Sequence, residues 1–180
     1  MKRLAARGAA AFGLAAVPAA AGLPLYFVVP EPWGSLTLFY LLLVCGALGG
    51  ASLARPDERG PVAFRFGLAF SIPGAVLPFS LLPADGPGIV ASTAAAWGLG
   101  LGAAAALGAL LSAPRLARLP HSRLRAALQA GRAFLVGGAA GGAVATLLVA
   151  VLPGRGYFAA WALAVIGACA LGGGLLGRPH

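Results

Sequence analysis

The chain has few charged residues, and acidic residues are scarcer than basic ones. Only 9% of its 180 residues are charged, with four Asp and Glu in total, whereas soluble domains carry roughly 25%. The sequence also holds only two His, two Cys and one Met. So little charge cannot cover the surface of a soluble domain that is 60% hydrophobic. The composition therefore predicts a protein that lies in a lipid bilayer.

The positions of these scarce residues exclude several kinds of chemistry. The four acids, both His and the single Lys lie outside the apolar runs. Catalytic bases, metal ligands and proton relays within a membrane depend on such residues. We therefore expect no enzyme, no metal site, no cofactor and no proton-coupled pump. Asp57 and Glu58 stand beside Arg55 and Arg59, and we expect local pairing among these neighbours.

Apolar residues form runs of 20 to 23 residues, each bounded by charge, Pro or Gly. At about 1.5 Å per residue, one run reaches roughly the 30 Å thickness of the bilayer hydrocarbon. Only one run contains a charge, Arg65, whose long side chain we expect to reach the headgroups. The pattern predicts an all-α, multi-pass membrane protein with six transmembrane helices. The runs are Ala9–Val29, Gly34–Ala54, Val62–Leu82, Ile89–Leu111, Ala133–Leu152 and Tyr157–Leu176.

The basic residues predict the orientation. If the N-terminus is cytoplasmic, every Lys and Arg except Arg155 falls on the inner side. This asymmetry is typical of inner-membrane proteins and predicts that both termini are cytoplasmic. It also accounts for the net charge of +9, so we expect no nucleic-acid partner. Residues 1–21 also read as a signal peptide, but apolar residues continue to Val29, and we expect the segment to be retained.

Three similar strings favour an internal repeat. They are ALGGASLARP at 47–56, ALGALLSAPR at 106–115 and ALGGGLLGRP at 170–179, and each ends an even-numbered run. Repeats of about this period usually mark a repeated supersecondary unit. We predict three pseudo-repeated hairpins of one orientation, at about 8–56, 60–115 and 131–179. The alternative is chance similarity in a chain rich in Ala, Gly and Leu.

Small residues at four-residue spacing predict seams of close helix packing. The clearest pairs are Gly46 with Gly50, Gly98 with Gly102, Gly137 with Gly141, and Gly138 with Gly142. Cys45 and Cys169 lie just before two of the repeated strings, and we expect them to act as small packing residues.

Prolines inside two of the runs indicate a candidate site. Each removes a backbone donor within a span and frees a carbonyl, and such breaks accompany substrate sites in transporters. The alternative is a proline kink that only shapes packing. The candidate substrate-binding residues are Pro18, Pro24, Ser71, Pro73, Pro78 and Thr146.

Residues 112–132 predict a basic cytoplasmic loop, with a short helix that Ser122 caps and that begins at Arg123. We expect it to bind anionic lipid headgroups or a soluble partner through four arginines. These are Arg115, Arg118, Arg123 and Arg125.

Two functions remain open. The first, which the prolines favour, is a small-solute transporter or channel, or the membrane subunit of a transporter. The alternative is a structural or assembly subunit of a membrane complex. A polar cavity in mid-membrane would favour the first, and a solid, glycine-packed bundle would favour the second. In either case the candidate protein partners are a second copy of the chain and other membrane subunits.

Overall fold

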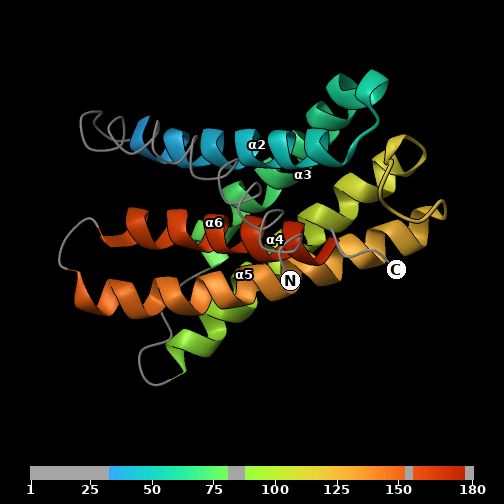
Figure 1. Ribbon diagram of the computed structural model, residues 1–180. Helices are drawn as coiled ribbons and strands as arrows, with labels where there is room; N and C mark the ends of the chain where they lie inside the picture. The colour runs from blue at the N-terminus through green and yellow to red at the C-terminus, as the bar shows by residue number, and fades with distance from the viewer. Residues whose placement is uncertain (1–32, 81–87, 153–155, 177–180) are drawn as a thin grey trace.

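The computed structural model describes residues 33–80, 88–152 and 156–176, with side chains in 40–72, 88–152 and 160–176. These residues are almost entirely helical and include no strand beyond one bridge between Ala54 and Leu116 (Figure 1). The all-helical prediction is confirmed for this part of the chain. Its helices are α2 (Trp33–Leu53), α3 (Arg59–Ser80), α4 (Ile89–Ser112), α5 (Arg123–Val151) and α6 (Gly156–Leu176), with short 3-10 helices η1 (Pro56–Glu58) and η2 (Ala113–Arg115).

Prolines mark the ends of two of these helices. Pro56 lies in the first turn of η1 and Pro114 in that of η2, shortly after α2 and α4 end. Proline has no backbone N–H and cannot continue a helix without breaking a bond. The first predicted run, Ala9–Val29, lies outside the described residues.

Two helices of the described part are long and apolar enough to cross a membrane. They are α4 with its extension, Ile89–Arg115, at a mean hydropathy of 1.7, and α5 at 2.1. Membrane association is thus supported for this region. The count of six spans and the hairpin repeat remain predictions.

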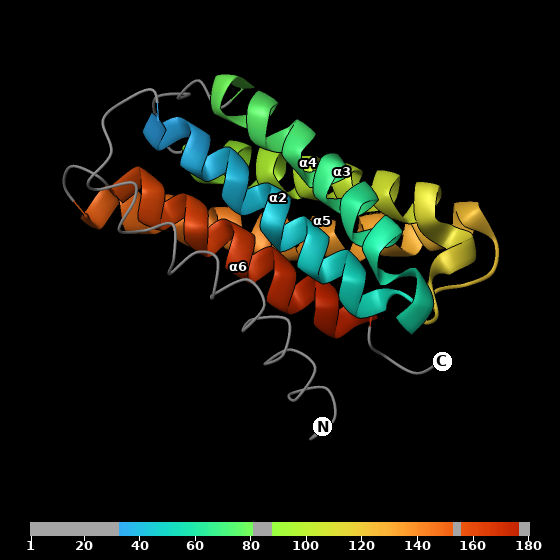
Figure 2. The ribbon, with the colours of Figure 1, turned by 90° about the horizontal axis from the view of Figure 1, so that it is seen from above.

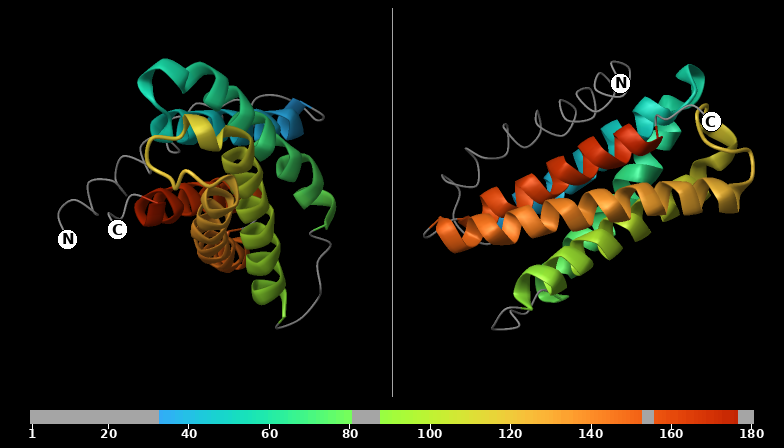
Figure 3. Two further views of the ribbon diagram at one scale, coloured as in Figure 1. Left: turned by 90° about the vertical axis from the view of Figure 1, so that its right-hand side faces the viewer. Right: turned by 60° about the horizontal axis from the view of Figure 1, so that its bottom comes forward.

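α5 lies between α4 and α6, and the most extensive helix contacts join these three. α2 and α3 form a separate antiparallel hairpin, which packs on α4 mainly through α3 (Figures 2 and 3). The helices α2, α4 and α6 all finish at one end of the bundle, which we call the arginine end (Figures 1 and 2).

Backbone hydrogen bonds join the ends of α2 and α4 at this point. The amide of Arg55 donates to the carbonyl of Arg115 at 3.1 Å, and the amide of Ala117 donates to the carbonyl of Leu53 at 3.1 Å. The last residues of the first two repeated strings therefore lie side by side. The superposition of the hairpins stays a prediction.

Two phenylalanines of α3 fill the space that glycines leave on neighbouring helices. A Cβ at Gly50 would lie 2.5 Å from Phe66 Cγ, and one at Gly108 would lie 2.9 Å from the same ring. One helical turn further along α3, Phe70 packs on Gly46. Its ring also meets that of Phe134 edge-to-face, with 5.4 Å between the ring centroids. Phe66 therefore contacts α2 and α4 at once.

The segment GGAAGG of α5 has glycines on two faces. A Cβ at Gly141 would lie 2.5 Å from the carbonyl oxygen of Ala164 on α6. A Cβ at Gly138 would lie 2.6 Å from the carbonyl oxygen of Trp97 on α4. Backbone thus approaches backbone on both sides of α5, as the predicted glycine seams require.

The outward faces of the helices are also apolar. A helix that is hydrophobic on all sides belongs in a core or in a membrane. No other described segment lies over these side chains, so lipid is the medium that suits them. The exposed large residues include Phe64, Leu68, Ile72, Leu99, Leu107, Leu124, Leu128, Val144, Leu147 and Val151.

Candidate functional site

The polar side chains that bridge separate helices gather at the arginine end. We define the arginine-end cluster as Glu58, Arg65, Leu111, Ser112 and Arg115. Glu58 ends η1, Arg65 lies in the second turn of α3, and the other three lie at the end of α4 and in η2. The backbone pairing of α2 with the segment after η2 holds these turns together.

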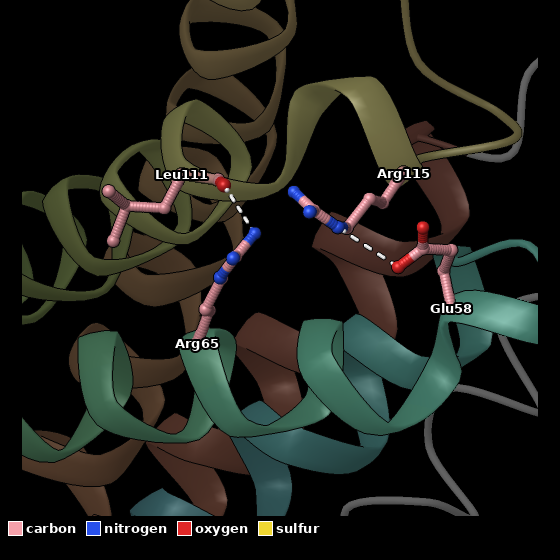
Figure 4. Close-up of polar contacts among 4 residues, drawn as sticks. All are labelled: Glu58, Arg65, Leu111 and Arg115. Carbon is pink, nitrogen blue, oxygen red and sulfur yellow. Dashed lines mark hydrogen bonds and ion pairs between the residues drawn. The ribbon is translucent and has the colours of Figure 1, made fainter.

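Glu58 and Arg115 form an ion pair across this junction. The Arg115 Nε donates to the Glu58 Oε2 at 2.9 Å, and each side chain is about a third exposed (Figure 4). The prediction of local pairing with Arg55 and Arg59 is therefore wrong for Glu58. Glu58 pairs with Arg115 because the α2–α3 hairpin places η1 next to η2. Arg115 lies 57 residues further along the chain, so the local sequence does not indicate this contact.

Arg65 binds the last turn of α4. Its Nη1 donates to the carbonyl oxygen of Leu111 at 2.9 Å (Figure 4). The last carbonyls of a helix have no partner within the helix, and a cation near them is also favoured by the helix dipole. Arg65 thus fastens α3 to α4. The side chain was expected to reach toward headgroups, and the structure places it on a neighbouring helix end.

Ser112, the next residue after Leu111, is fully buried, and its hydroxyl has no hydrogen-bond partner in the described part of the chain. An unsatisfied buried hydroxyl costs about 1–3 kcal/mol. The end of α4 therefore combines one carbonyl that an arginine satisfies with one hydroxyl that no described residue satisfies.

The basic segment 112–132 is not a single loop. α5 begins at Arg123 and continues to Val151, so residues 123–132 are its first turns and not a short separate helix. Ser122 does stand at the N-cap position, but its side chain makes no capping bond. Only residues 116–122 connect η2 to α5.

This division separates the four arginines that were predicted to act together. Arg115 is half-buried and paired with Glu58, whereas Arg118, Arg123 and Arg125 are exposed. Cations at a helix N-terminus are opposed by the helix dipole, and α5 has no acidic residue in its first turn. The described chain gives Arg123 and Arg125 no internal counter-charge.

The predicted substrate-binding residues have different outcomes. Pro18 and Pro24 lie outside the described residues. Pro73 and Pro78 lie in α3, which stays helical to Ser80, but their side chains are outside the described part. The prolines therefore do not end α3, which continues as a helix through both positions.

The two candidate hydroxyls bond within their own helices. Ser71 is buried and donates to the carbonyl of Leu68 at 2.7 Å, and Thr146 donates to the carbonyl of Gly142 at 2.8 Å. Phe70, next to Ser71, meets Phe134, which lies roughly 18 Å along α5 from Thr146. The structure places the two hydroxyls at different levels and does not bring them together.

The cysteines and acidic residues of the described segments form no recognisable chemical site. Cys45 and Cys169 are buried among apolar side chains of the core and are not joined by a disulfide. Within residues 33–80, 88–152 and 156–176, no group of three His, Cys, Asp or Glu lies close enough to hold a metal ion.

The residues of the arginine-end cluster that sequence reasoning missed are Glu58, Leu111 and Ser112. Glu58 was assigned to a local pair, and a main-chain carbonyl leaves no trace in composition. The only available signal was Arg65, the one charge within an apolar run, which required some polar partner.

Comparisons with models of protein families, with curated protein sequences and with solved structures give no match to this chain.

Proposed function

We propose that this protein is an integral, multi-pass protein of the bacterial inner membrane that serves as a structural or assembly subunit. The observation that carries the proposal is the packing of α5 between α4 and α6. The glycines at 137, 138, 141 and 142 each face a neighbouring backbone within 3.0 Å of the Cβ that they lack. Such contacts hold the backbones of these three helices close together at these positions, while their outward faces remain apolar.

The chemistry of the described interior supports the same proposal. Trp97 meets Trp161 edge-to-face at 6.1 Å, and the buried side chains around them are chiefly Ala, Leu and aromatic residues. The hydroxyls of Ser71 and Thr146 are bonded to their own helices, so neither presents a free donor to a solute. A scaffold needs shape and apolar surface, which these helices have.

The proposed partners follow from the two outer surfaces. The apolar faces of the helices would bind lipid tails, a second copy of the chain or other membrane subunits. Arg118, Arg123 and Arg125 at the arginine end would bind anionic headgroups at the inner face, which attract basic residues near the membrane. In this orientation both termini are cytoplasmic, and the proposed role involves no catalysis.

Membrane integration and orientation can be tested first. Alkaline carbonate should leave the protein in the membrane pellet, and release into the supernatant would reject the proposal. Single cysteines at Pro32, Gly86 and Gly154, in a chain with Cys45 and Cys169 replaced by Ala, should react with an impermeant reagent from outside. A cysteine at Arg125 should not react, and labelling there would reject the orientation.

The assembly role predicts a complex. In gently solubilised membranes the protein should migrate as a species larger than its 17.7 kDa monomer. Gly49→Leu tests the outer face of α2, because no described residue lies within 4 Å of a Cβ at this position. Loss of the larger species with an unchanged melting temperature would support assembly through that face, and a monomer in the unaltered protein would reject the role.

A small-solute transporter is the second candidate, and the prolines of α3 favour it. Because α3 remains helical through Pro73 and Pro78, the carbonyls of Ala69 and Gly74 lose their normal donors four residues later. Gly74→Leu should then block solute flux into reconstituted vesicles while the protein stays folded. Unchanged flux with a lowered melting temperature would reject transport and support the scaffold.

A further inference from the structure

Two guanidinium groups converge at the arginine-end cluster. Arg65 comes from α3 and contacts the carbonyl of Leu111, and Arg115 comes from η2 and contacts Glu58 through Nε. Figure 4 shows the Arg65 guanidinium and the terminal nitrogens of Arg115 directed toward one another. Each contact uses one donor, and a guanidinium carries several in a planar fork.

The charges of the cluster do not balance. Two cations face one carboxylate, and Arg65 has only a neutral carbonyl as its partner. In the described residues, Glu58 is the only acid that makes an ion pair. Like charges repel more strongly near a membrane than in water because the dielectric constant is lower. The arrangement would be stabilised by one more anion that both arginines share.

The surroundings indicate what kind of anion this is. Phe64, adjacent to Arg65, is 70% exposed, and Leu68 and Ile72 follow it on the same face of α3 at four-residue spacing. Leu111, whose carbonyl Arg65 binds, has a half-exposed side chain. A polar pair of arginines thus borders an apolar stripe, and the ligand that suits both is amphiphilic.

We propose that Arg65 and Arg115 together bind the phosphate of an anionic phospholipid, whose acyl chains lie along Phe64, Leu68 and Ile72. Guanidinium forks match phosphate oxygens in geometry and charge. The inference deepens the proposed membrane function, on which it depends, by giving a specific site to one lipid. It differs from the diffuse attraction of Arg118, Arg123 and Arg125 because the cluster holds its arginines in place.

The test measures the melting temperature of the full chain in a neutral detergent during titration with phosphatidylglycerol. We expect a saturable rise for the unaltered protein. Arg65→Gln and Arg115→Gln should each weaken the apparent affinity about tenfold or more, as expected when a charge-assisted bond is lost. Arg132→Gln is the matched control. It removes an exposed positive charge from the N-terminal third of α5, outside the arginine-end cluster, and should leave the titration unchanged.

Two further arms identify the ligand and the role of the fork. Arg65→Lys keeps the charge and should give an intermediate affinity. Inorganic phosphate alone should produce no saturable rise at the concentrations at which the lipid acts, and an equal rise would overturn the choice of a lipid. If Arg65→Gln does not fold, Arg115→Gln decides, because its ion pair lies near the surface.

The result that overturns the proposal is an unchanged lipid affinity in Arg115→Gln and in Arg65→Gln or Arg65→Lys. A lower melting temperature with unchanged affinity would assign Arg65 to the end of α4 alone and also reject the site. Either failure leaves membrane integration intact, because carbonate extraction tests that separately. An equal loss of affinity in Arg132→Gln would show diffuse charge attraction and reject a specific site.

Discussion

The α4–α5–α6 region and the α2–α3 hairpin are held together by different kinds of contact. In the first region, glycines bring one helix backbone against another, as at Gly141 and Ala164. In the second, the nearest neighbours of Gly46 and Gly50 are phenyl rings, as with Phe66 at Gly50, and the backbone approach at Gly67 is looser, at 3.2 Å from the carbonyl oxygen of Leu43. The hairpin then meets α4 through that same ring and through the pairs at the arginine end.

This difference predicts how each region would respond to side-chain substitutions. Backbone contacts have no side chain that can rotate away, so an added group must push two helices apart. A ring contact depends on the size of one side chain, which can be altered without moving a backbone. We expect the first region to be the rigid part of the protein and the second to be attached by a few separable interactions.

The largest effect is expected at Gly141. In Gly141→Leu the added Cβ would meet the carbonyl oxygen of Ala164 at 2.5 Å, and the rest of the side chain would need more space still. Overpacking a core with extra methylene groups forces side chains off their rotamers and shifts the backbone. Here the clash is with a main-chain carbonyl that cannot rotate away, so we expect the cost to exceed that of an emptied ring site. We expect loss of folded protein, measured as the monodisperse fraction after detergent extraction.

Gly49→Leu is the matched control for this change. Gly49 lies in a helix of the hairpin, and no described residue has an atom within 4 Å of its added Cβ, so the same leucine should be accommodated. If Gly141→Leu were as stable as Gly49→Leu, the description of α5 as a helix clamped on two faces would be wrong.

The next largest effect is expected at Phe66. The ring is 2% exposed and touches Gly50 and Gly108, so Phe66→Ala would leave a cavity between three helices. Removal of a buried phenyl group costs about 3–5 kcal/mol, but the α4–α5–α6 contacts would remain. Hydrogen exchange should therefore rise in α2 and α3 more than in α5.

Phe64→Ala serves as the control because Phe64 lies in the same helix and is 70% exposed. It should change the melting temperature little. Equal exchange in all helices of Phe66→Ala would show that the hairpin and the other three helices unfold as one unit, and the comparison between them would fail.

These two regions were predictable from the sequence to different degrees. The apolar runs located four helices within a few residues at most ends, because bilayer-length runs end at Pro, Gly or Arg. The run predicted for α5 began too late, at Ala133, because the arginines before it were taken as a sign of a loop. The helix in fact begins at Arg123, and Ala126 and Ala130 continue its small, buried face. Periodicity was the better guide there than charge.

The candidate site was less predictable. Glu58 and Arg115 are far apart in the chain, and their contact depends on how the hairpin meets α4. Local sequence offered Arg59 as an equally good partner, and nothing in composition distinguishes the two. The glycine seams, in contrast, were predicted correctly at Gly98 and Gly137, because close approach is a property of the residue itself.

The smallest effect is expected for the ion pair that joins η1 to η2. Glu58→Gln removes the charge but keeps the shape, and both partners are about a third exposed. Ion pairs at such exposure contribute about 0–1 kcal/mol, so the melting temperature should fall by a few degrees at most. Asp57→Asn, an exposed acid without an ion pair in the described residues, should change it less. Raised salt should lower the melting temperature of the unaltered protein toward that of Glu58→Gln, because screening weakens exposed charge pairs. A fall in Glu58→Gln as large as that in Phe66→Ala would mean that the ion pair, and not the ring, attaches the hairpin to α4.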